Sequence, residues 1–131
     1  MRKKNKATKI LIVDDEDNVR EVISYVLEEK GFITEEAKDG KEALKKISRI
    51  KPDAIILDIG MPGMDGFQAC KRLRKNRHTQ NIPIIFLSAQ ECATEFIRDM
   101  PGAAIEYIEK PFDLAYLLKR IDHILVATPA K

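Results

Sequence analysis

The hydrophobic residues of the chain fall into five short runs that are separated by longer segments with a different period. The runs are Ile10–Val13, Phe32–Ala37, Ala54–Leu57, Ile82–Leu87 and Ile105–Ile108. Four of them are almost continuous in aliphatic or aromatic residues, which is typical of strands buried on both faces of a parallel sheet. The run Phe32–Ala37 is more polar, so we expect an edge strand there.

Between these runs the hydrophobic residues recur at the spacing of an amphipathic helix. The five stripes are Val19, Val22, Ile23, Val26 and Leu27; Ala43, Leu44 and Ile47; Phe67, Cys70 and Leu73; Ala93, Phe96, Ile97 and Met100; and Leu114, Leu117, Leu118, Ile121, Ile124 and Leu125. The first stripe is followed by Gly31 and the fourth by Pro101-Gly102, residues that end helices. The chain is therefore predicted to be (βα)₅, a doubly wound α/β fold with a five-stranded parallel sheet and helices on both faces.

A length of 131 residues suits one domain. We place this domain at residues 10–126, between a basic N-terminal extension, 1–9, and a C-terminal tail, 127–131, and expect no output domain within this chain. No segment has the roughly 18 apolar residues of a membrane span, and no apolar signal-peptide core follows the basic start. Cys70 and Cys92 lack metal-ligand or redox spacing. These features predict a soluble, cytoplasmic protein with no membrane contact.

The charges are unevenly distributed. Five of the 23 basic side chains lie in residues 1–9, which contain no acid, so the rest of the chain carries 18 basic against 21 acidic side chains. Short charged ends are usually solvated tails. We therefore expect no direct binding of nucleic acid, and we look for chemistry in the acidic part of the chain.

Residues with carboxylate, hydroxyl or ammonium groups follow the first, third, fourth and fifth hydrophobic runs. Asp14-Asp15 follows the first, Asp58 the third, Ser88 the fourth and Glu109-Lys110 the fifth. Open parallel sheets place their ligand site at the carboxyl ends of the strands. We therefore expect these side chains to converge at one edge of the sheet.

The chemistry of such a cluster follows from its charge. Asp14, Asp15 and Asp58 together carry −3, which a divalent cation and Lys110 would neutralise. All-oxygen ligation suits Mg²⁺, with Mn²⁺ as the alternative, rather than zinc. A metal beside a carboxylate, a hydroxyl and an ammonium group is suited to hold a phosphoryl group, which one aspartate could attack in line. The competing interpretation is that Asp14, Asp15 and Asp17 cap the helix that follows.

These motifs together resemble the receiver domain of two-component response regulators, from Lys9 to Leu125. Residues 10–15, Ile-Leu-Ile-Val-Asp-Asp, are similar to the first strand and acidic pair of that family. Residues 58–66, Asp-Ile-Gly-Met-Pro-Gly-Met-Asp-Gly, are similar to its phosphoacceptor segment, and Lys110-Pro111-Phe112 to its lysine-proline signature. The resemblance implies the strand order 2-1-3-4-5, which is known for chemotaxis receivers, and a cis Lys110-Pro111 bond.

The resemblance also implies a role for each site residue. Asp58 is the expected phosphoacceptor, Asp15 and Asp58 the expected Mg²⁺ ligands, and Asp14 is expected to act mainly through metal-bound water. The backbone carbonyl of Gly60 is expected to be a further metal ligand. The remaining expected roles are contact of Lys110 with the acyl phosphate and a switch pair formed by Ser88 and Tyr107.

Several of these residues have simpler interpretations. Tyr107 could be a half-buried strand aromatic, and Ser88 could cap the fourth helix with Glu91 completing the cap. His78 and His123 fall on polar segments and are not expected to be catalytic, whereas Cys70 is expected in the core.

The sequence also departs from the family pattern at a few positions. Gly60 and Gln90, which in the family flank the path of the attacking water, have uncharged side chains. Gly102 lies one residue further before the lysine than is usual, which suggests a shorter fourth helix and a longer loop.

The function that the resemblance implies is a phosphorylatable signalling switch rather than a multiple-turnover enzyme. A histidine kinase or phosphotransfer protein would donate the phosphoryl group, and the face of the fourth helix and fifth strand would control a downstream target. A phosphorylation-dependent homodimer is compatible with this family. One alternative is a Mg²⁺-dependent phosphatase of the haloacid-dehalogenase type, which needs a second aspartate where this chain has Gly60. The other is a degenerate receiver that acts only as a docking scaffold.

Overall fold

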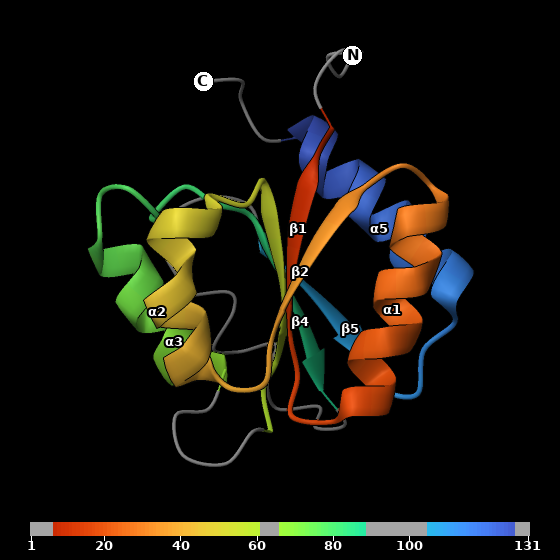
Figure 1. The fold of residues 1–131 in the computed structure, drawn as a ribbon, viewed down its shortest axis with the longest axis horizontal. Helices are drawn as coiled ribbons and strands as arrows, with labels where there is room; N and C mark the ends of the chain where they lie inside the picture. The colour runs from red at the N-terminus through yellow and green to blue at the C-terminus, as the bar shows by residue number, and fades with distance from the viewer. Residues whose placement is uncertain (1–6, 61–65, 89–104, 128–131) are drawn as a thin grey trace.

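The computed structural model describes residues 7–60, 66–88 and 105–127. Five parallel strands form one sheet in the order β2-β1-β3-β4-β5, and Figure 1 shows this sheet in the middle of the molecule. The strands are β1 (Lys9–Val13), β2 (Ile33–Ala37), β3 (Ala54–Asp58), β4 (Ile84–Ser88) and β5 (Ile105–Glu109). The helices are α1 (Asp17–Glu29), α2 (Gly40–Ile50), α3 (Gly66–Lys75) and α5 (Leu114–Ala127). The expected doubly wound fold and strand order are confirmed.

The sheet separates two hydrophobic clusters, because alternate residues of each central strand point to opposite faces. On one face, Leu11 and Leu57 pack with residues of α2 and α3. On the other, Ile10 and Ile56 pack with residues of α1 and α5. Helices therefore cover both faces, and each central strand is buried from both sides. Figure 1 shows α2 and α3 on one side of the sheet and α1 and α5 on the other.

The two edge strands differ from the three central ones. β1 is buried from Ile10 onward, and β3 and β4 are buried throughout. β2 has only one buried residue, Ala37, which confirms the edge position expected from its polar sequence. β5 was expected to be buried on both faces, but only Ile108 is buried. The reason is that β5 lies at the opposite edge of the sheet, where it pairs with β4 alone among the described strands.

Some element boundaries also differ from the sequence expectation. Phe32 was placed in the second strand, but its backbone N–H donates to the carbonyl of Leu27 and so completes the end of α1. Ile82 and Pro83 precede β4 instead of beginning it, because the Ile82 N–H turns back to the carbonyl of Thr79. The expected fourth helix and the loop at 61–64 lie outside the described residues.

The ends of α1 follow the sequence signals only in part. Gly31 adopts a φ of 94°, the left-handed conformation that suits glycine just after a helix. At the other end the N-cap is Glu16, whose side chain makes no capping hydrogen bond. The competing interpretation of the aspartates as helix-start residues holds in part, because Asp17 lies in the first turn of α1 and Asp14 accepts from the N–H of the N-cap residue Glu16. No helix among residues 7–60, 66–88 and 105–127 is long and apolar enough to cross a membrane.

Candidate functional site

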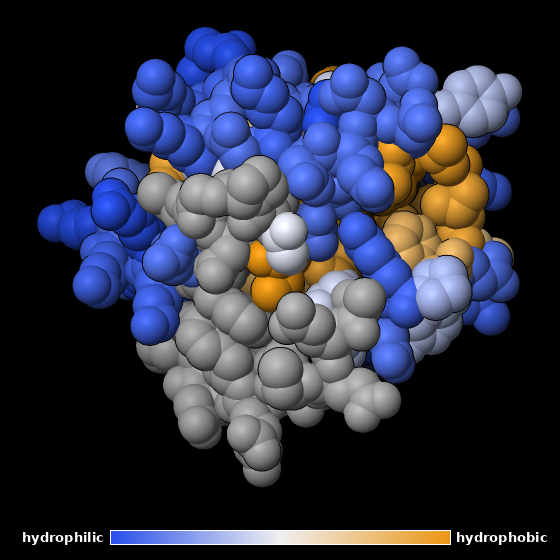
Figure 2. Space-filling model, turned by 90° about the horizontal axis from the view of Figure 1, so that it is seen from below, coloured by the Kyte–Doolittle hydropathy of each residue, from blue (hydrophilic) through white to orange (hydrophobic). Residues whose placement is uncertain are grey.

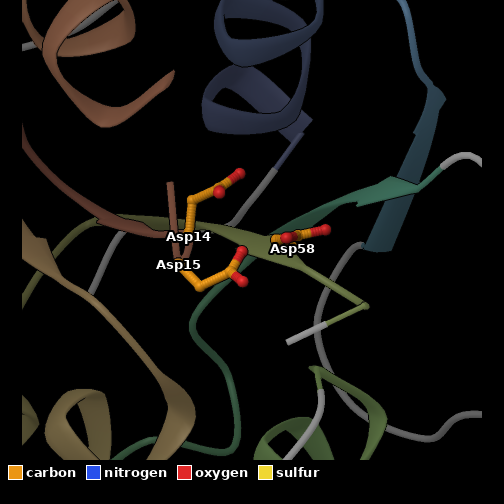
Figure 3. Close-up of side chains that lie close together, drawn as sticks. All are labelled: Asp14, Asp15 and Asp58. Carbon is orange, nitrogen blue, oxygen red and sulfur yellow. The ribbon is translucent and has the colours of Figure 1, made fainter. Parts of the chain in front are cut away.

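Three carboxylates converge where two central strands end. Asp58 is the last residue of β3, and Asp14 and Asp15 directly follow β1, its hydrogen-bonded neighbour. One carboxylate oxygen from each of the three lies within 4.8 Å of the other two, and Figure 3 shows the three side chains side by side. The parallel register of β1 and β3, in which Val13 pairs with Leu57, places these residues together. The structure thus brings together the acids that the sequence separates by more than forty positions.

The three aspartates differ in their access to solvent. Asp14 is fully buried and Asp58 is buried, whereas Asp15 is exposed. The Asp14 Oδ1 atom accepts a hydrogen bond of 2.9 Å from the backbone N–H of Glu16, which fixes its orientation within the loop. The cluster is therefore open to solvent on the side of Asp15 and closed beneath Asp14.

Lys110 supplies the cation of the cluster. Its Nζ atom lies 3.4 Å from Asp14 Oδ2 and 3.5 Å from Asp58 Oδ1. The backbone N–H of Lys110 donates to the carbonyl of Ser88 at 2.7 Å, and the Lys110-Pro111 bond is cis, as the family resemblance implied. Partial burial alone would lower the pKa of Lys110, but the charges of Asp14 and Asp58 outweigh it and raise the pKa. The lysine therefore stays positively charged between the two acids.

The surroundings of Asp58 disfavour its ionised form. Burial raises its pKa, and the charge of Asp14 raises it further, against the smaller opposing effects of Lys110 and of a hydrogen bond from the Gly60 N–H. That last bond, from Gly60 to Asp58 Oδ1, is 3.3 Å long. The raised pKa of Asp58 agrees with the repulsion expected from the sequence. One lysine does not balance three carboxylates, so the site favours a further positive charge.

The other predicted site residues lie around this cluster. Ser88 is buried at the end of β4, directly after Leu87, which pairs with Asp58. Tyr107 is half-buried in β5 opposite Phe86 and packs against the hydrophobic cluster under α2 and α3. Gly60 is exposed beside Asp58. Gln90 and Glu91, and with them the proposed cap at Ser88, lie outside the described residues.

The two histidines and Cys70 differ in their burial. His78 and His123 are exposed. Cys70 is buried in the core, and burial raises the pKa of its thiol, so it remains protonated at neutral pH. These observations agree with the expected core role of Cys70.

One residue that contacts the site loop was not predicted from the sequence. Arg20 in α1 donates a hydrogen bond of 2.6 Å from Nη1 to the backbone carbonyl of Asp14. Its side chain also pairs with Glu36 on β2. The signal was weak, because an arginine on a helix is ordinarily solvated and its partner Glu36 becomes a neighbour only when β2 pairs with β1.

The fold and the site define a class: a doubly wound α/β protein whose strand-end cluster joins three aspartates to one lysine. The family model of the response regulator receiver domain matches residues 10–122. The chain belongs to this family, whose members are phosphoacceptor switches of two-component signalling.

Individual relatives agree with this assignment. The chain is 39% identical over 120 residues to the response regulator MprA of Mycobacterium leprae, covering 92% of this chain and 52% of that protein. It thus spans about half the length of the curated relatives it matches.

Solved structures agree as well. A putative response regulator from Chloroflexus aurantiacus is 39% identical with a TM-score of 0.82, covering 92% of this chain and 99% of that one. The response regulator TrrA of Thermotoga maritima, solved in complex with Mg²⁺-BeF, is 35% identical with a TM-score of 0.78, covering 89% of this chain and 98% of that one. These matches do not support the phosphatase alternative, which also lacks its second aspartate at Gly60.

Proposed function

We propose that this chain accepts a phosphoryl group on Asp58 in a Mg²⁺-dependent step. The observation that carries the proposal is the acidic cluster with its single bridging lysine. Asp58 lies where β3 ends, near the exposed residues Asp15 and Gly60, and an incoming donor would approach it from their side. A negative residue, Asp14, and a positive residue, Lys110, lie close to Asp58 on its inner side.

The residues present fit a magnesium ion. Three carboxylates whose oxygens lie within 4.8 Å of one another offer only oxygen donors, and together they carry more charge than Lys110 neutralises. Mg²⁺ prefers such sites with few protein ligands and retained waters, and Mn²⁺ accepts the same set. Asp15 and Asp58 would bind the ion directly, Asp14 mainly through water, and the Gly60 carbonyl would add a ligand. When bound, the ion supplies positive charge that offsets the charge of the phosphoryl oxygens.

The chain's own residues then divide the reaction between them. An ionised Oδ atom of Asp58 forms a bond to phosphorus, while the bond from phosphorus to the donor breaks and the donor keeps that electron pair. Lys110 neutralises a phosphoryl oxygen, and the Ser88 hydroxyl donates to another. Hydrolysis of the acyl phosphate by water restores the Asp58 carboxylate. The chain is modified and restored, and we assign it no turnover of an external substrate.

The partners follow from this chemistry. The donor is a histidine kinase or phosphotransfer protein, and the readout is a downstream protein that senses a change around Ser88 and Tyr107. Figure 2 shows the strand-end side of the molecule, where an apolar area interrupts the polar surface on the side of α1 and α5. Apart from that area, α1 and α5 carry exposed large hydrophobic residues, namely Val22, Tyr25 and Tyr116. An apolar area beside a polar site suits docking of a protein donor.

Incubation with acetyl phosphate and Mg²⁺, followed by intact mass measurement, tests the phosphoacceptor. We expect one added phosphoryl group in the wild type and in Asp122→Asn, which changes an exposed aspartate on α5. We expect none in Asp58→Asn or when EDTA replaces the metal.

Fast hydrolysis could hide the adduct, so binding of beryllofluoride in the presence of Mg²⁺ serves as a second measurement. An undiminished adduct in Asp58→Asn would overturn the assignment of Asp58. Absence of both adduct and beryllofluoride binding in the wild type would overturn the function as a whole.

A further inference from the structure

Arg20 contacts three parts of the molecule that meet at the acidic loop. From α1 its guanidinium donates to the backbone carbonyl of Asp14 at 2.6 Å and to Glu36 Oε1 on β2 at 3.0 Å. Its third nitrogen donates to Asp17 in the first turn of α1. Only 13% of the side chain is exposed. Arg20 therefore ties the loop after β1 to both a helix and an edge strand.

These contacts complete the anchoring of Asp14. The Asp14 N–H donates to the carbonyl of Ala37 at the end of β2, and its side chain accepts from the Glu16 N–H. Its carbonyl is the remaining polar group, and Arg20 holds it. The direction of the peptide that follows this carbonyl sets where Asp15 begins. Arg20 thus constrains both acids of the pair without touching either carboxylate.

The charge of Arg20 and its contact with the loop have opposite effects on the affinity for a metal ion. A positive group near the cluster opposes binding of a cation, so by Coulomb's law alone its removal would strengthen metal binding. Asp17 and Glu36 accompany Arg20 and would be left unpaired, which would add to the attraction. A contribution of Arg20 through the loop geometry has the opposite sign. The sign of the change in metal affinity therefore distinguishes the two effects.

We propose that Arg20 is a positioning residue for the metal-binding aspartates, acting through the Asp14 carbonyl and held in turn by Glu36. The inference rests on the proposed function, because it concerns affinity for Mg²⁺. Groups that orient metal ligands typically change metal affinity by about 10–100-fold when they are removed.

The chain offers a matched control on the opposite edge of the sheet. Arg120 in α5 donates from Nε to Glu106 Oε1 on β5 at 2.9 Å, which is the same helix-to-edge-strand arrangement. Within residues 7–60, 66–88 and 105–127, its other neighbours are His123 and Tyr116, and none of the site aspartates is among them. Loss of Arg120 therefore removes a comparable ion pair but leaves the loop after β1 unchanged.

The test is the Mg²⁺ dissociation constant of the whole chain, measured by calorimetry and repeated with Mn²⁺ by electron paramagnetic resonance. We expect Arg20→Gln to raise it at least about tenfold, and Arg120→Gln to change it less than twofold. Arg20→Lys keeps the charge, but an ammonium group cannot reach both the Asp14 carbonyl and Glu36 as the guanidinium does. We therefore expect an intermediate increase in the dissociation constant. Glu36→Gln gives a second route if Arg20→Gln does not fold, with an expected increase of about threefold.

A second measurement needs no metal. Hydrogen exchange of the Glu16 amide in EDTA reports whether the bond to Asp14 Oδ1 persists, and we expect faster exchange in Arg20→Gln but not in Arg120→Gln.

An unchanged or lower dissociation constant in Arg20→Gln, with unchanged Glu16 exchange, would overturn the positioning role. If the wild type bound no Mg²⁺, the proposed function would fail. The exchange of Glu16 would then decide by itself whether Arg20 holds the loop.

Discussion

Two arginines join helices to the two edges of the sheet, and the chemistry of the two bridges is nearly the same. Arg20 pairs with Glu36 of β2, and Arg120 pairs with Glu106 of β5, with Nε–Oε1 distances of 3.0 and 2.9 Å. Only Arg20 also holds the backbone of the acidic loop. An ion pair of this kind contributes to stability wherever it lies, but it bears on the site only where a further bond connects it. The comparison separates what maintains the fold from what sets the geometry of the acids.

The largest expected effect is the loss of Lys110 from the site, compared with the loss of Arg120 from the far edge of the sheet. Lys110→Ala leaves Asp14 and Asp58 without their shared partner and removes a donor to the phosphoryl oxygens. Loss of one such donor commonly costs about 10²–10³ in rate. We expect that decrease in the rate of phosphoryl uptake from acetyl phosphate at saturating Mg²⁺. Arg120→Gln is expected to stay within about twofold of the wild type, and equal rates in Lys110→Ala and Arg120→Gln would contradict the role of Lys110.

A smaller effect separates the two arginines in the metal dependence of uptake. In Arg20→Gln we expect the Mg²⁺ concentration for half-maximal rate to rise about tenfold, while the plateau rate changes less than about threefold. The reason is that displaced acids bind the ion weakly but react normally once it is bound. Timed measurements of phosphoryl uptake at a series of Mg²⁺ concentrations give both the half-maximal concentration and the plateau rate. A lower plateau with an unchanged midpoint would place Arg20 in the chemical step instead.

The two arginines are expected to differ by about 1 kcal/mol in their effect on stability. Each substitution removes a partly exposed ion pair, which typically contributes up to about 1 kcal/mol. Arg20→Gln also leaves the Asp14 carbonyl without its charged donor, so its total should reach about 2 kcal/mol. Urea unfolding in EDTA gives both values. If Arg120→Gln proved far more destabilising than Arg20→Gln, the two bridges would not be equivalent and the control would have to be replaced.

The smallest effect concerns the acid at the centre of the site. Since burial and Asp14 raise the pKa of Asp58 above its ordinary 3.8, its ionised form destabilises the metal-free fold at neutral pH. Asp58→Asn should therefore raise the free energy of unfolding in EDTA, by about 1 kcal/mol.

The pH dependence of this effect has a definite sign. The folded state binds the Asp58 proton more tightly than the unfolded state does, so the wild type gains stability relative to Asp58→Asn as pH falls through the raised pKa. The advantage of Asp58→Asn should be complete above that pKa and should vanish toward the ordinary value of 3.8. Unfolding of both proteins across this range measures the difference, and an advantage that grew on acidification would contradict the assigned direction.

The sequence was sufficient for the parts of the fold that depend on local pattern and on general topology. Continuous apolar runs predicted the central strands, and the polar run at 32–37 predicted an edge. The same reasoning failed for β5, because an apolar run such as Ile105–Ile108 does not show whether a strand has neighbours on both sides. That property depends on which strands pair, and the chain order alone does not give it.

The residues of the site could be predicted from the same topology, but only in part. Acids that follow strands meet at one edge of any parallel sheet, so Asp14, Asp15 and Asp58 could be grouped before their distances were known. The bond between Arg20 and the Asp14 carbonyl could not be predicted in this way. It depends on the conformation of the Arg20 side chain and on the pairing of β2 with β1. Every residue type has a backbone carbonyl that can accept a hydrogen bond, so the sequence does not show which carbonyl will be used.

The most direct test of the account is the position of the phosphoryl group on the chain. Borohydride reduces the acyl phosphate of an aspartate to homoserine, which peptide sequencing by mass spectrometry then locates. After incubation with acetyl phosphate and Mg²⁺, we predict homoserine at position 58 and at no other aspartate. Homoserine at Asp14 or Asp15, or an adduct that resists borohydride, would contradict the assignment of Asp58 as the phosphoacceptor.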